Sequence, residues 1–252
     1  MAEISKHATV ERGAKIADDV KIGPFTYIGP HVRIGAGCVI ESNVTITGKT
    51  VLGERNRVFP LAVIGTSEGK GGEEGEVVIG VANSIREHAT IYGGTSEAPT
   101  RIGDDNLVMI GCHIGAGAKL GNHGILINST LIGAGAVLED YVHTSGFIVI
   151  DPGVHVGAYT FTLGYTEINR DAPPYAMVQG TPFRVRGVNT EKLRRCGFGD
   201  SSIKALKSAF HEIYNSSGEG VDAAVLQRLL AQEDCDLHVQ RLVQSVQKSL
   251  IK

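Results

Sequence analysis

The sequence predicts an all-β solenoid, a parallel β-helix of hexapeptide repeats, followed by a small C-terminal α-helical domain. Three observations predict this fold. An aliphatic residue recurs at every sixth position over most of the chain up to Ile168, glycine is unusually frequent with 33 residues, and a helical period appears only after Thr190. In a solenoid each short repeat packs only on its neighbours, so a fixed period can extend over a long chain.

The first run of repeats extends from Ile4 to Ile64, and every sixth residue in it is Ile, Val or Leu. A six-residue unit is too short for a helix pair, but a β-branched residue followed by Gly, Asn or Asp fits a short strand and a tight turn. We expect the aliphatic side chains to point inward, the glycines to adopt positive φ, and successive coils to stack about 4.8 Å apart.

Two insertions interrupt the repeat. The phase slips across Thr66 to Val78 and again across Gly93 to Arg101, and it otherwise continues to Ile168, with only Thr144 and Thr162 as polar residues at the repeated position. A solenoid tolerates insertions as loops that leave one corner, so both segments are expected to project. They are either solvated loops without a role or, as we favour, the walls of a cleft against a neighbouring subunit.

The end of the repeats divides the chain into a β-helix domain of residues 1–172, a connector of residues 173–189 and a helical domain of residues 190–252. The connector, rich in Pro and Gly, is predicted to be extended. The string TEKLRRCGF predicts a short helix that Gly197 stops.

The helical domain is expected to contain three longer helices after this short one. The segment DSSIKALKSAFHEIYNSSG predicts a capped amphipathic helix, and further helices are predicted near residues 221–232 and 235–251. One face of the first should bury Ile203, Leu206, Phe210 and Ile213. The small domain would therefore close one end of the solenoid.

The composition predicts a soluble chain, since 42% of the residues are hydrophobic, 20% are charged and the net charge is −3. The N-terminal string MAEISKHATVERGAK lacks the apolar run of a signal peptide, and no window approaches the length of a membrane span, so a cytoplasmic location is expected. No basic block with interleaved aromatic residues suggests nucleic acid.

The sequence predicts neither a metal site nor a cofactor. The cysteines lack the paired spacings of zinc sites and disulfide frameworks. Strings such as GAGAKLG resemble dinucleotide-binding loops, but they lie in turns of the repeat without a βαβ setting. The cysteines are Cys38, Cys112, Cys196 and Cys235.

Four strings carry a more specific resemblance: IGPFTYIGPHV, IREHATIYGGT, GDDNLVMIGCHIG, and PPYAMVQG followed by GVNTEKLRRCGF. They resemble the UDP-N-acetylglucosamine O-acyltransferases of lipid A biosynthesis over nearly the whole chain. The repeat alone would indicate only some acyltransferase, and the helical tail narrows the choice. The resemblance implies a left-handed parallel β-helix with three hexads per coil, a homotrimer, and transfer of a (hydroxy)acyl chain from acyl carrier protein to the 3-hydroxyl of UDP-N-acetylglucosamine or a related UDP-sugar.

Such a transfer needs a base for the hydroxyl proton and donors for the developing oxyanion. The family supplies the base in a run resembling H-I-x-H-D, which aligns with His113 to Gly117. The first histidine is kept as His113, but the expected base position is Ala116, and the acidic residue beside it is Gly117. Other substrate-side histidines of the family align with Tyr92, Gly135 and Asp151, and a glutamine aligns with Pro152.

Family residues that lie farther from the expected base are retained. The resemblance assigns Gly164 to the acyl-chain pocket, where it limits chain length, and it assigns Asn189, Glu191 and Arg195 to nucleotide binding. The second arginine of that cluster is replaced by Cys196, which should weaken the hold on phosphate.

Two hypotheses remain open. In the first, the chain is an enzyme whose base chemistry has moved, with His113 as the first candidate; His143 and His155 share its place in the hexad, but their hexads should fall on different faces of the prism. In the second, it is a catalytically inactive homologue, a trimeric binding or interaction protein that lacks the base. We place the enzyme first because the fold, the tail and Gly164 persist, although a fold does not guarantee its chemistry.

Overall fold

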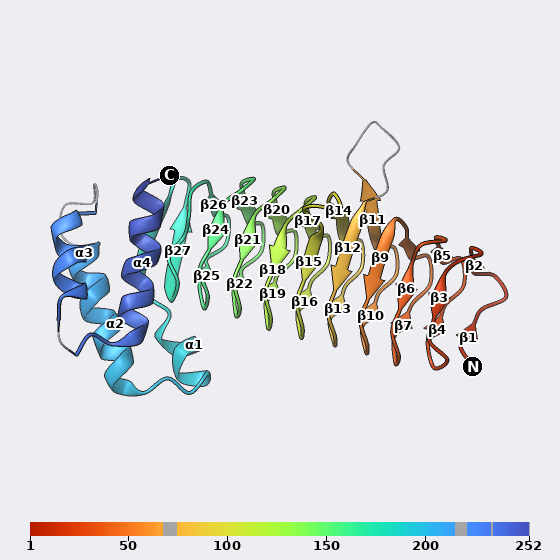
Figure 1. Cartoon of the computed structure of the whole chain (residues 1–252), viewed down its shortest axis with the longest axis horizontal. Helices are drawn as coiled ribbons and strands as arrows, with labels where there is room; N and C mark the ends of the chain where they lie inside the picture. The colour runs from red at the N-terminus through yellow and green to blue at the C-terminus, as the bar shows by residue number, and fades with distance from the viewer. Residues whose placement is uncertain (68–74, 215–220, 233, 252) are drawn as a thin grey trace.

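The computed structural model describes residues 1–67, 75–214, 221–232 and 234–251. Its coils stack in chain order along the long axis of the molecule, and the helices lie together at the C-terminal end (Figure 1). Both parts of the predicted fold, the all-β solenoid and the small helical domain, are confirmed.

Three parallel sheets form the faces of the solenoid, and the chain visits them in turn. The eleven-stranded sheet contains, in spatial order, β1 (Glu3–Ile4), β4 (Lys21–Ile22), β7 (Val39–Ile40), β10 (Arg57–Val58), β13 (Ser84–Ile85), β16 (Leu107–Val108), β19 (Ile125–Leu126), β22 (His143–Thr144), β25 (Phe161–Thr162), β27 (Ala176–Gly180) and β28 (Phe183–Val188). The nine-stranded sheet contains β2 (Thr9–Val10), β5 (Tyr27–Ile28), β8 (Thr45–Ile46), β11 (Val63–Ser67), β14 (Thr90–Gly93), β17 (His113–Ile114), β20 (Leu131–Ile132), β23 (Val149–Ile150) and β26 (Glu167–Ile168). The eight-stranded sheet contains β3 (Lys15–Ile16), β6 (Arg33–Ile34), β9 (Lys49–Leu52), β12 (Glu76–Ile79), β15 (Thr100–Ile102), β18 (Lys119–Leu120), β21 (Val137–Leu138) and β24 (His155–Val156).

The register confirms three hexads per coil. Outside the insertions and the last coil, paired strand residues are eighteen positions apart, as Lys15 and Arg33 are, and Ile16 and Ile34. The repeated aliphatic residues point inward as predicted, and each fully buried one contributes about 1.5–3 kcal/mol relative to exposure. The first coil is less buried because no coil precedes it: Ile4 is 43% exposed, and Val10 and Ile16 are only partly buried.

Turn geometry and close packing both contribute to the high glycine content. The fourth position of the hexad turn has positive φ, but non-glycine residues such as Phe25 (φ 61°) adopt it as well as Gly117 (φ 71°). The second position is restricted by packing instead, because a Cβ added at Gly115 would lie 2.7 Å from the backbone nitrogen of Ala134 in the next coil. The expectation that positive φ explains the glycine count is therefore incomplete.

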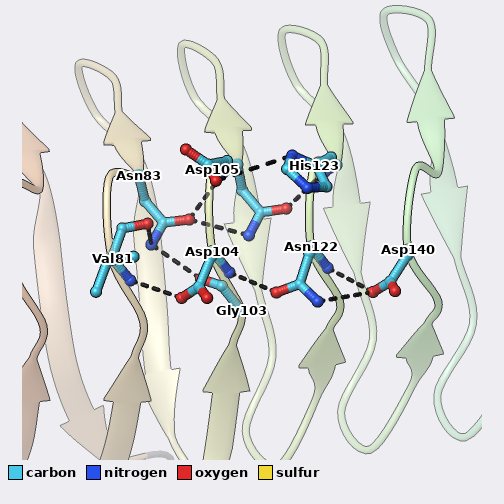
Figure 2. A network of polar contacts seen from close by, with 10 residues as sticks. Val81, Asn83, Gly103, Asp104, Asp105, Asn122, His123 and Asp140 are labelled. Atoms are coloured by element: carbon cyan, nitrogen blue, oxygen red, sulfur yellow. Dashed lines mark hydrogen bonds and ion pairs between the residues drawn. The ribbon is translucent and has the colours of Figure 1, made fainter. Parts of the chain in front are cut away.

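Rows of polar side chains stabilise the corner between the eight- and eleven-stranded sheets (Figure 2). The Oδ1 of buried Asn83 accepts hydrogen bonds from the backbone and side-chain N–H groups of Asn106, both at 2.9 Å, and Asn83 donates in the same way to Asn56. In a second row Asp104 donates its N–H to Oδ1 of Asn122, and Asn122 donates to Asp140. Each side chain thus satisfies donors of the neighbouring coil.

The insertions begin and end inside the sheets. Thr66 and Ser67 extend β11 and pair with Tyr92 and Gly93, and residues 76–78 belong to β12, so these parts of the first segment do not project as predicted. The rest of that prediction concerns residues 68–74, which lie outside the described residues. In the second segment residues 95–98 are exposed, whereas Pro99 and Thr100 are buried against the solenoid.

The segment predicted as a connector contains a β-hairpin. β27 continues the eleven-stranded sheet parallel to β25, and β28 returns antiparallel to it after the cis peptide bond between Thr181 and Pro182. Helix α1 (Thr190–Arg195) follows directly, and the chain then turns at Gly197, where φ is 83°.

Helices α2 (Asp200–Ile213), α3 (Ala223–Leu230) and α4 (Leu237–Ile251) complete the small domain. The face predicted for α2 is buried, with Ile203, Leu206, Phe210 and Ile213 all in the core. Asp222 caps α3 by accepting the N–H of Ala224 at 2.8 Å. Among the described residues no helix is both long enough and apolar enough to cross a membrane.

A charged cluster fixes α4 to the solenoid. The carboxylate of Glu139 accepts hydrogen bonds from Arg241 at 2.7 Å and from the N–H of Ala158 at 2.9 Å, and its other oxygen pairs with His155 Nε2 at 2.9 Å. The hydrogen bond from His155 is the largest cause that lowers the pKa of Glu139 from 4.5 to about 2, despite its partial burial. The helical domain therefore sits on an ion-paired corner of the β-helix.

Candidate functional site

His113 lies on the outer face of the nine-stranded sheet and is half-buried. Its strand neighbour Ile114 points into the core, so the imidazole faces outward. The register pairs His113 directly with Thr90 of β14, and His113 Nδ1 lies 2.8 Å from the Thr90 hydroxyl. The ring of Tyr92 meets the imidazole edge-on, with centroids 4.9 Å apart.

Apolar side chains follow His113 along the same row. The register continues from His113 to Leu131 and then to Val149, which are 44% and 41% exposed. Large apolar residues are also exposed in the adjoining turns, where Phe147 and Tyr165 stack at 5.3 Å. The imidazole thus has a hydroxyl on one side and an exposed apolar surface on the other.

The turn after β17 holds Ala116, where the resemblance places the family's base. Ala116 is half-buried, its carbonyl accepts the N–H of Gly135 at 2.9 Å, and its methyl group cannot accept a proton. The next residue, Gly117, donates its N–H to the hydroxyl of Thr100 at 2.9 Å, and that hydroxyl donates to the carbonyl of Tyr92 at 2.6 Å. Buried Thr100 therefore anchors the second insertion to this turn.

Successive coils bring together the positions that the resemblance aligns with substrate-side residues. Gly135 lies in the turn stacked directly on Ala116, and the N–H of Gly153, two residues after Asp151, donates to the carbonyl of Ala134. Residues 116, 135 and 151 therefore follow one another along the same corner. Tyr92 belongs to β14 and contacts His113 instead.

The three histidines that share one hexad position lie on three different faces, as predicted. His143 is in β22 of the eleven-stranded sheet, where burial lowers its pKa and Phe161 packs against its ring. His155 is in β24 of the eight-stranded sheet, and its Nε2 is engaged by Glu139. Among the three, His113 has a neutral hydroxyl partner at Nδ1.

Gly164 lies in the turn after β25, next to Gly146 of the previous coil. A Cβ added there would meet only ordinary contacts, 3.6 Å from the Gly146 carbonyl oxygen and 4.0 Å from Ser145 Cβ. Its φ is not in the left-handed region, so the chain's own structure does not require glycine at this position. The neighbouring aromatic residue, Tyr165, is 77% exposed.

Asn189 directly precedes α1, Glu191 lies in its first turn and Arg195 is its last residue. Asn189 is 8% exposed, and its side-chain amide donates to the carbonyl of Tyr159 at 2.9 Å, which fixes the start of the helix on the solenoid. Glu191 and Arg195 form an exposed ion pair one turn apart on α1. Strands β20, β23 and β26 lie between His113 and the helical end, so a single chain does not bring His113 to these three residues.

Sequence reasoning missed Thr90 as a contact of His113. The two residues are 23 positions apart, because the second insertion adds five residues to the usual spacing of eighteen, and only the corrected register places them side by side. Within the described part of the chain no group of three or more His, Cys, Asp or Glu side chains has the arrangement of a metal site.

The repeat and its three-sheeted coil define the chain first as a hexapeptide-repeat protein. The family model "Bacterial transferase hexapeptide (six repeats)" matches residues 13–48, and "Udp N-acetylglucosamine O-acyltransferase; Domain 2" matches residues 171–250. The chain is 38% identical over 240 residues to the acyl-[acyl-carrier-protein]–UDP-N-acetylglucosamine O-acyltransferase of Saccharophagus degradans, with 93% of each chain covered. It is 38% identical over 230 residues to the enzyme of the same name from Stutzerimonas stutzeri, with 89% of each covered.

Solved structures agree over almost the entire length. The UDP-N-acetylglucosamine acyltransferase of Francisella novicida superposes with a TM-score of 0.91 at 32% identity, covering 98% of this chain and 91% of that one. LpxA of Acinetobacter baumannii gives the same TM-score and identity and covers 98% and 97%. The chain therefore belongs to the UDP-N-acetylglucosamine O-acyltransferase family, and its solenoid is a left-handed β-helix.

Proposed function

We propose that this chain is an acyl-carrier-protein-dependent O-acyltransferase that works in the cytoplasm and transfers a (hydroxy)acyl chain to UDP-N-acetylglucosamine or a related UDP-sugar. The observation that carries the proposal is the extent of the family relation. It spans solenoid and helical domain together, at 38% identity over 93% of both chains. A shared repeat alone would support only the fold.

His113 is the base in this proposal. Its Nε2 takes the proton of the sugar hydroxyl while the hydroxyl oxygen attacks the thioester carbonyl carbon. The carbon–sulfur bond then breaks, and the imidazolium returns the proton to the departing thiolate. The products are a sugar ester and the free thiol of the carrier, so no further reactant is needed. Histidine suits both steps because its ordinary pKa of about 6.5 is near cellular pH.

The acyl chain would lie at the corner that Gly146 and Gly164 leave without side chains. The exposed rings of Phe147 and Tyr165 border this corner and offer an apolar surface for methylene groups. Because the local backbone accepts a side chain at Gly164, the ligand explains glycine there better than the fold does. Larger residues at this position would shorten the acyl chain that fits.

The nucleotide would bind at α1 through Asn189, Glu191 and Arg195. Arg195 is exposed and can offer its guanidinium to a phosphate, while Cys196 contributes no second cation. Since these residues lie several coils from His113 within one chain, a neighbouring subunit would complete the site.

A homotrimer supplies that neighbour. Five large apolar residues on and beside strands β17 to β26 of the nine-stranded sheet are at least 39% exposed, and a patch of this kind marks a contact surface. In a ring of three subunits this patch would meet a different face of the next subunit, which would place His113 beside the groove between them. The five residues are Ile110, Leu131, Phe147, Val149 and Tyr165.

Incubation of purified protein with acyl carrier protein loaded with hydroxyacyl chains and with UDP-N-acetylglucosamine tests the proposal, with the acylated sugar detected by mass spectrometry. We expect one acyl group per sugar and release of the carrier thiol. Binding of both substrates by calorimetry without any transfer would instead support the alternative, a trimeric binding protein that has lost turnover.

Ala116→His is an informative variant for separating the active acyltransferase from the binding protein that has lost turnover. If substrates bind but the base is missing, this change should create transfer, since residue 116 is half-buried in a turn at the same corner as residues 135 and 151. If His113 already serves, the added histidine should change the rate little. Adding Gly117→Asp to this variant would strain the turn, because φ at Gly117 is 71° and a Cβ there would lie 3.3 Å from the Ala98 carbonyl oxygen.

A further inference from the structure

We infer that Lys192 binds the diphosphate of the UDP-sugar and supplies the second cation that Cys196 does not. The inference rests on the proposed function, because it concerns the nucleotide site proposed at α1. Lys192 lies one helical turn before Cys196, and the N–H of Cys196 donates to the Lys192 carbonyl at 3.0 Å. Residues four apart in a helix share a face. The lysine therefore presents its charge on the face where Cys196 presents none.

Lys192 differs from the two other cations of α1. Arg194 pairs with Asp200 at 3.8 Å, Arg195 pairs with Glu191, and both arginines are exposed. Lys192 is half-buried, and among the described residues no ion pair joins it to a carboxylate. An ammonium that is partly removed from water is costly without a counter-charge. A bound anion would therefore stabilise Lys192 more than it would stabilise a fully solvated lysine.

The groups beside the ammonium are uncharged rings. Lys192 Nζ lies 5.3 Å from the centroid of the Tyr141 ring. His143 lies two residues after Tyr141, and its pKa is lowered below the ordinary value of 6.5, first by burial and then by the charge of Lys192. The imidazole is therefore neutral at cellular pH. Neither ring supplies the negative charge that would balance the lysine.

Helix geometry places Lys192 next to Arg195. Successive residues of an α-helix are rotated by about 100°, so Lys192 lies between the buried side chain of Leu193 and the exposed pair of Glu191 and Arg195. Residues three apart are neighbours on a helix surface. A diphosphate has two phosphoryl groups, and the guanidinium and the ammonium can each contact one of them.

The solenoid fixes Lys192 through the same corner that holds the rest of the nucleotide site. The side-chain amide of Asn189 donates to the carbonyl of Tyr159 at 2.9 Å, and the Tyr159 ring stacks on Tyr141 at 4.8 Å. The ammonium of Lys192 lies over Tyr141. Because the lysine is already positioned, it loses little conformational freedom when a ligand binds.

Binding of uridine, UDP and UDP-N-acetylglucosamine to full-length protein tests the inference without any need for turnover. Lys192→Met removes the charge and keeps an unbranched apolar stem. We expect the Kd for UDP and for UDP-N-acetylglucosamine, measured by calorimetry, to rise about 10- to 100-fold, the range for a hydrogen bond to a charged group. The Kd for uridine, followed by NMR titration, should stay within about twofold because uridine has no phosphate.

Three further variants serve as controls. Arg194→Gln removes one positive charge from the same helix, at an exposed position outside the proposed site, and should change UDP affinity by less than about twofold. Lys192→Arg keeps the charge and should bind nearly as the native protein does. Adding Cys196→Arg to Lys192→Met returns a cation to the same face, so it should recover most of the lost affinity.

The possible results separate this inference from the proposed function. Unchanged UDP affinity in Lys192→Met overturns the inference, as does an equal loss for uridine and UDP, which would show a packing role. An equal loss in Arg194→Gln overturns it too, because the effect would then come from net charge alone. These three results leave the proposed acyl transfer intact. Native protein that binds neither UDP nor UDP-N-acetylglucosamine would instead overturn the nucleotide site itself.

Discussion

Replacement of Glu139 by glutamine should uncouple the helical domain from the solenoid in a pH-dependent way. The pKa of Glu139 is lowered from 4.5 to about 2, first by the hydrogen bond from His155 and then by the Ala158 N–H and Arg241. At about 1.4 kcal/mol per pKa unit a fully shielded carboxylate would contribute about 3 kcal/mol. Because 30% of the Glu139 side chain is exposed and solvent screens the pairs, we expect about 2 kcal/mol.

The direction with pH follows from the lowered pKa. Glu139 stabilises the folded state fully above pH 4.5, and this contribution is lost as the pH falls from 4.5 to about 2. Linkage with these two values predicts that about half is lost by about pH 3. Glutamine does not titrate, so native protein and Glu139→Gln should differ by about 2 kcal/mol at about pH 5 and by about 1 kcal/mol at about pH 3.

Urea unfolding at the two pH values measures this difference, since the free energy extrapolates linearly with denaturant. Glu54→Gln is a matched control, because Glu54 pairs with Arg55 on the surface with 57% of its side chain exposed. That variant should change stability by less than about 0.5 kcal/mol. A gap between native protein and Glu139→Gln that is the same at both pH values would refute the reasoning.

Three other substitutions test the corner, the subunit contact and the acyl site. Asn83→Ala removes hydrogen bonds to both neighbouring coils and should cost about 2–4 kcal/mol in urea unfolding, whereas Asn122→Ala, in the more exposed row, should cost less. Leu131→Asp should convert the proposed trimer to monomer in analytical ultracentrifugation, and Lys119→Asp, on another face, should not; a trimer in both would exclude the apolar patch as the contact. Gly164→Met should shift the preferred acyl donor to one shorter by several carbons, at unchanged folding stability, and an unchanged donor preference would separate Gly164 from the acyl site.

The repeat predicts the fold because an aliphatic side chain at the same position of every hexad must point inward, whatever the turns do. Ile34, Leu52 and Ile64 alone fix the period, and the three sheets follow once a coil closes after three hexads. The hairpin of β27 and β28 was not predicted, since its sequence has neither the period of six nor a clear alternation and contains Pro182 at the turn.

Contacts between side chains of distant segments could not be predicted from the sequence, for a different reason. Glu139 and Arg241 are 102 residues apart, and nothing local to either residue predicts their pairing. The pair of Thr90 and His113 depends on a register that the second insertion shifts by five residues. The position of Ala116 in the turn after β17 could be read from the repeat, but which neighbouring groups surround His113 could not.

The rate of acyl transfer to UDP-N-acetylglucosamine by native protein, relative to His113→Ala, is the measurement on which the proposed chemistry depends most. A base that accepts the hydroxyl proton contributes about 10²- to 10⁴-fold, so the variant should be slower by that factor while sugar binding by calorimetry is retained. Equal rates, or native protein that binds both substrates and transfers nothing, would contradict a base at His113.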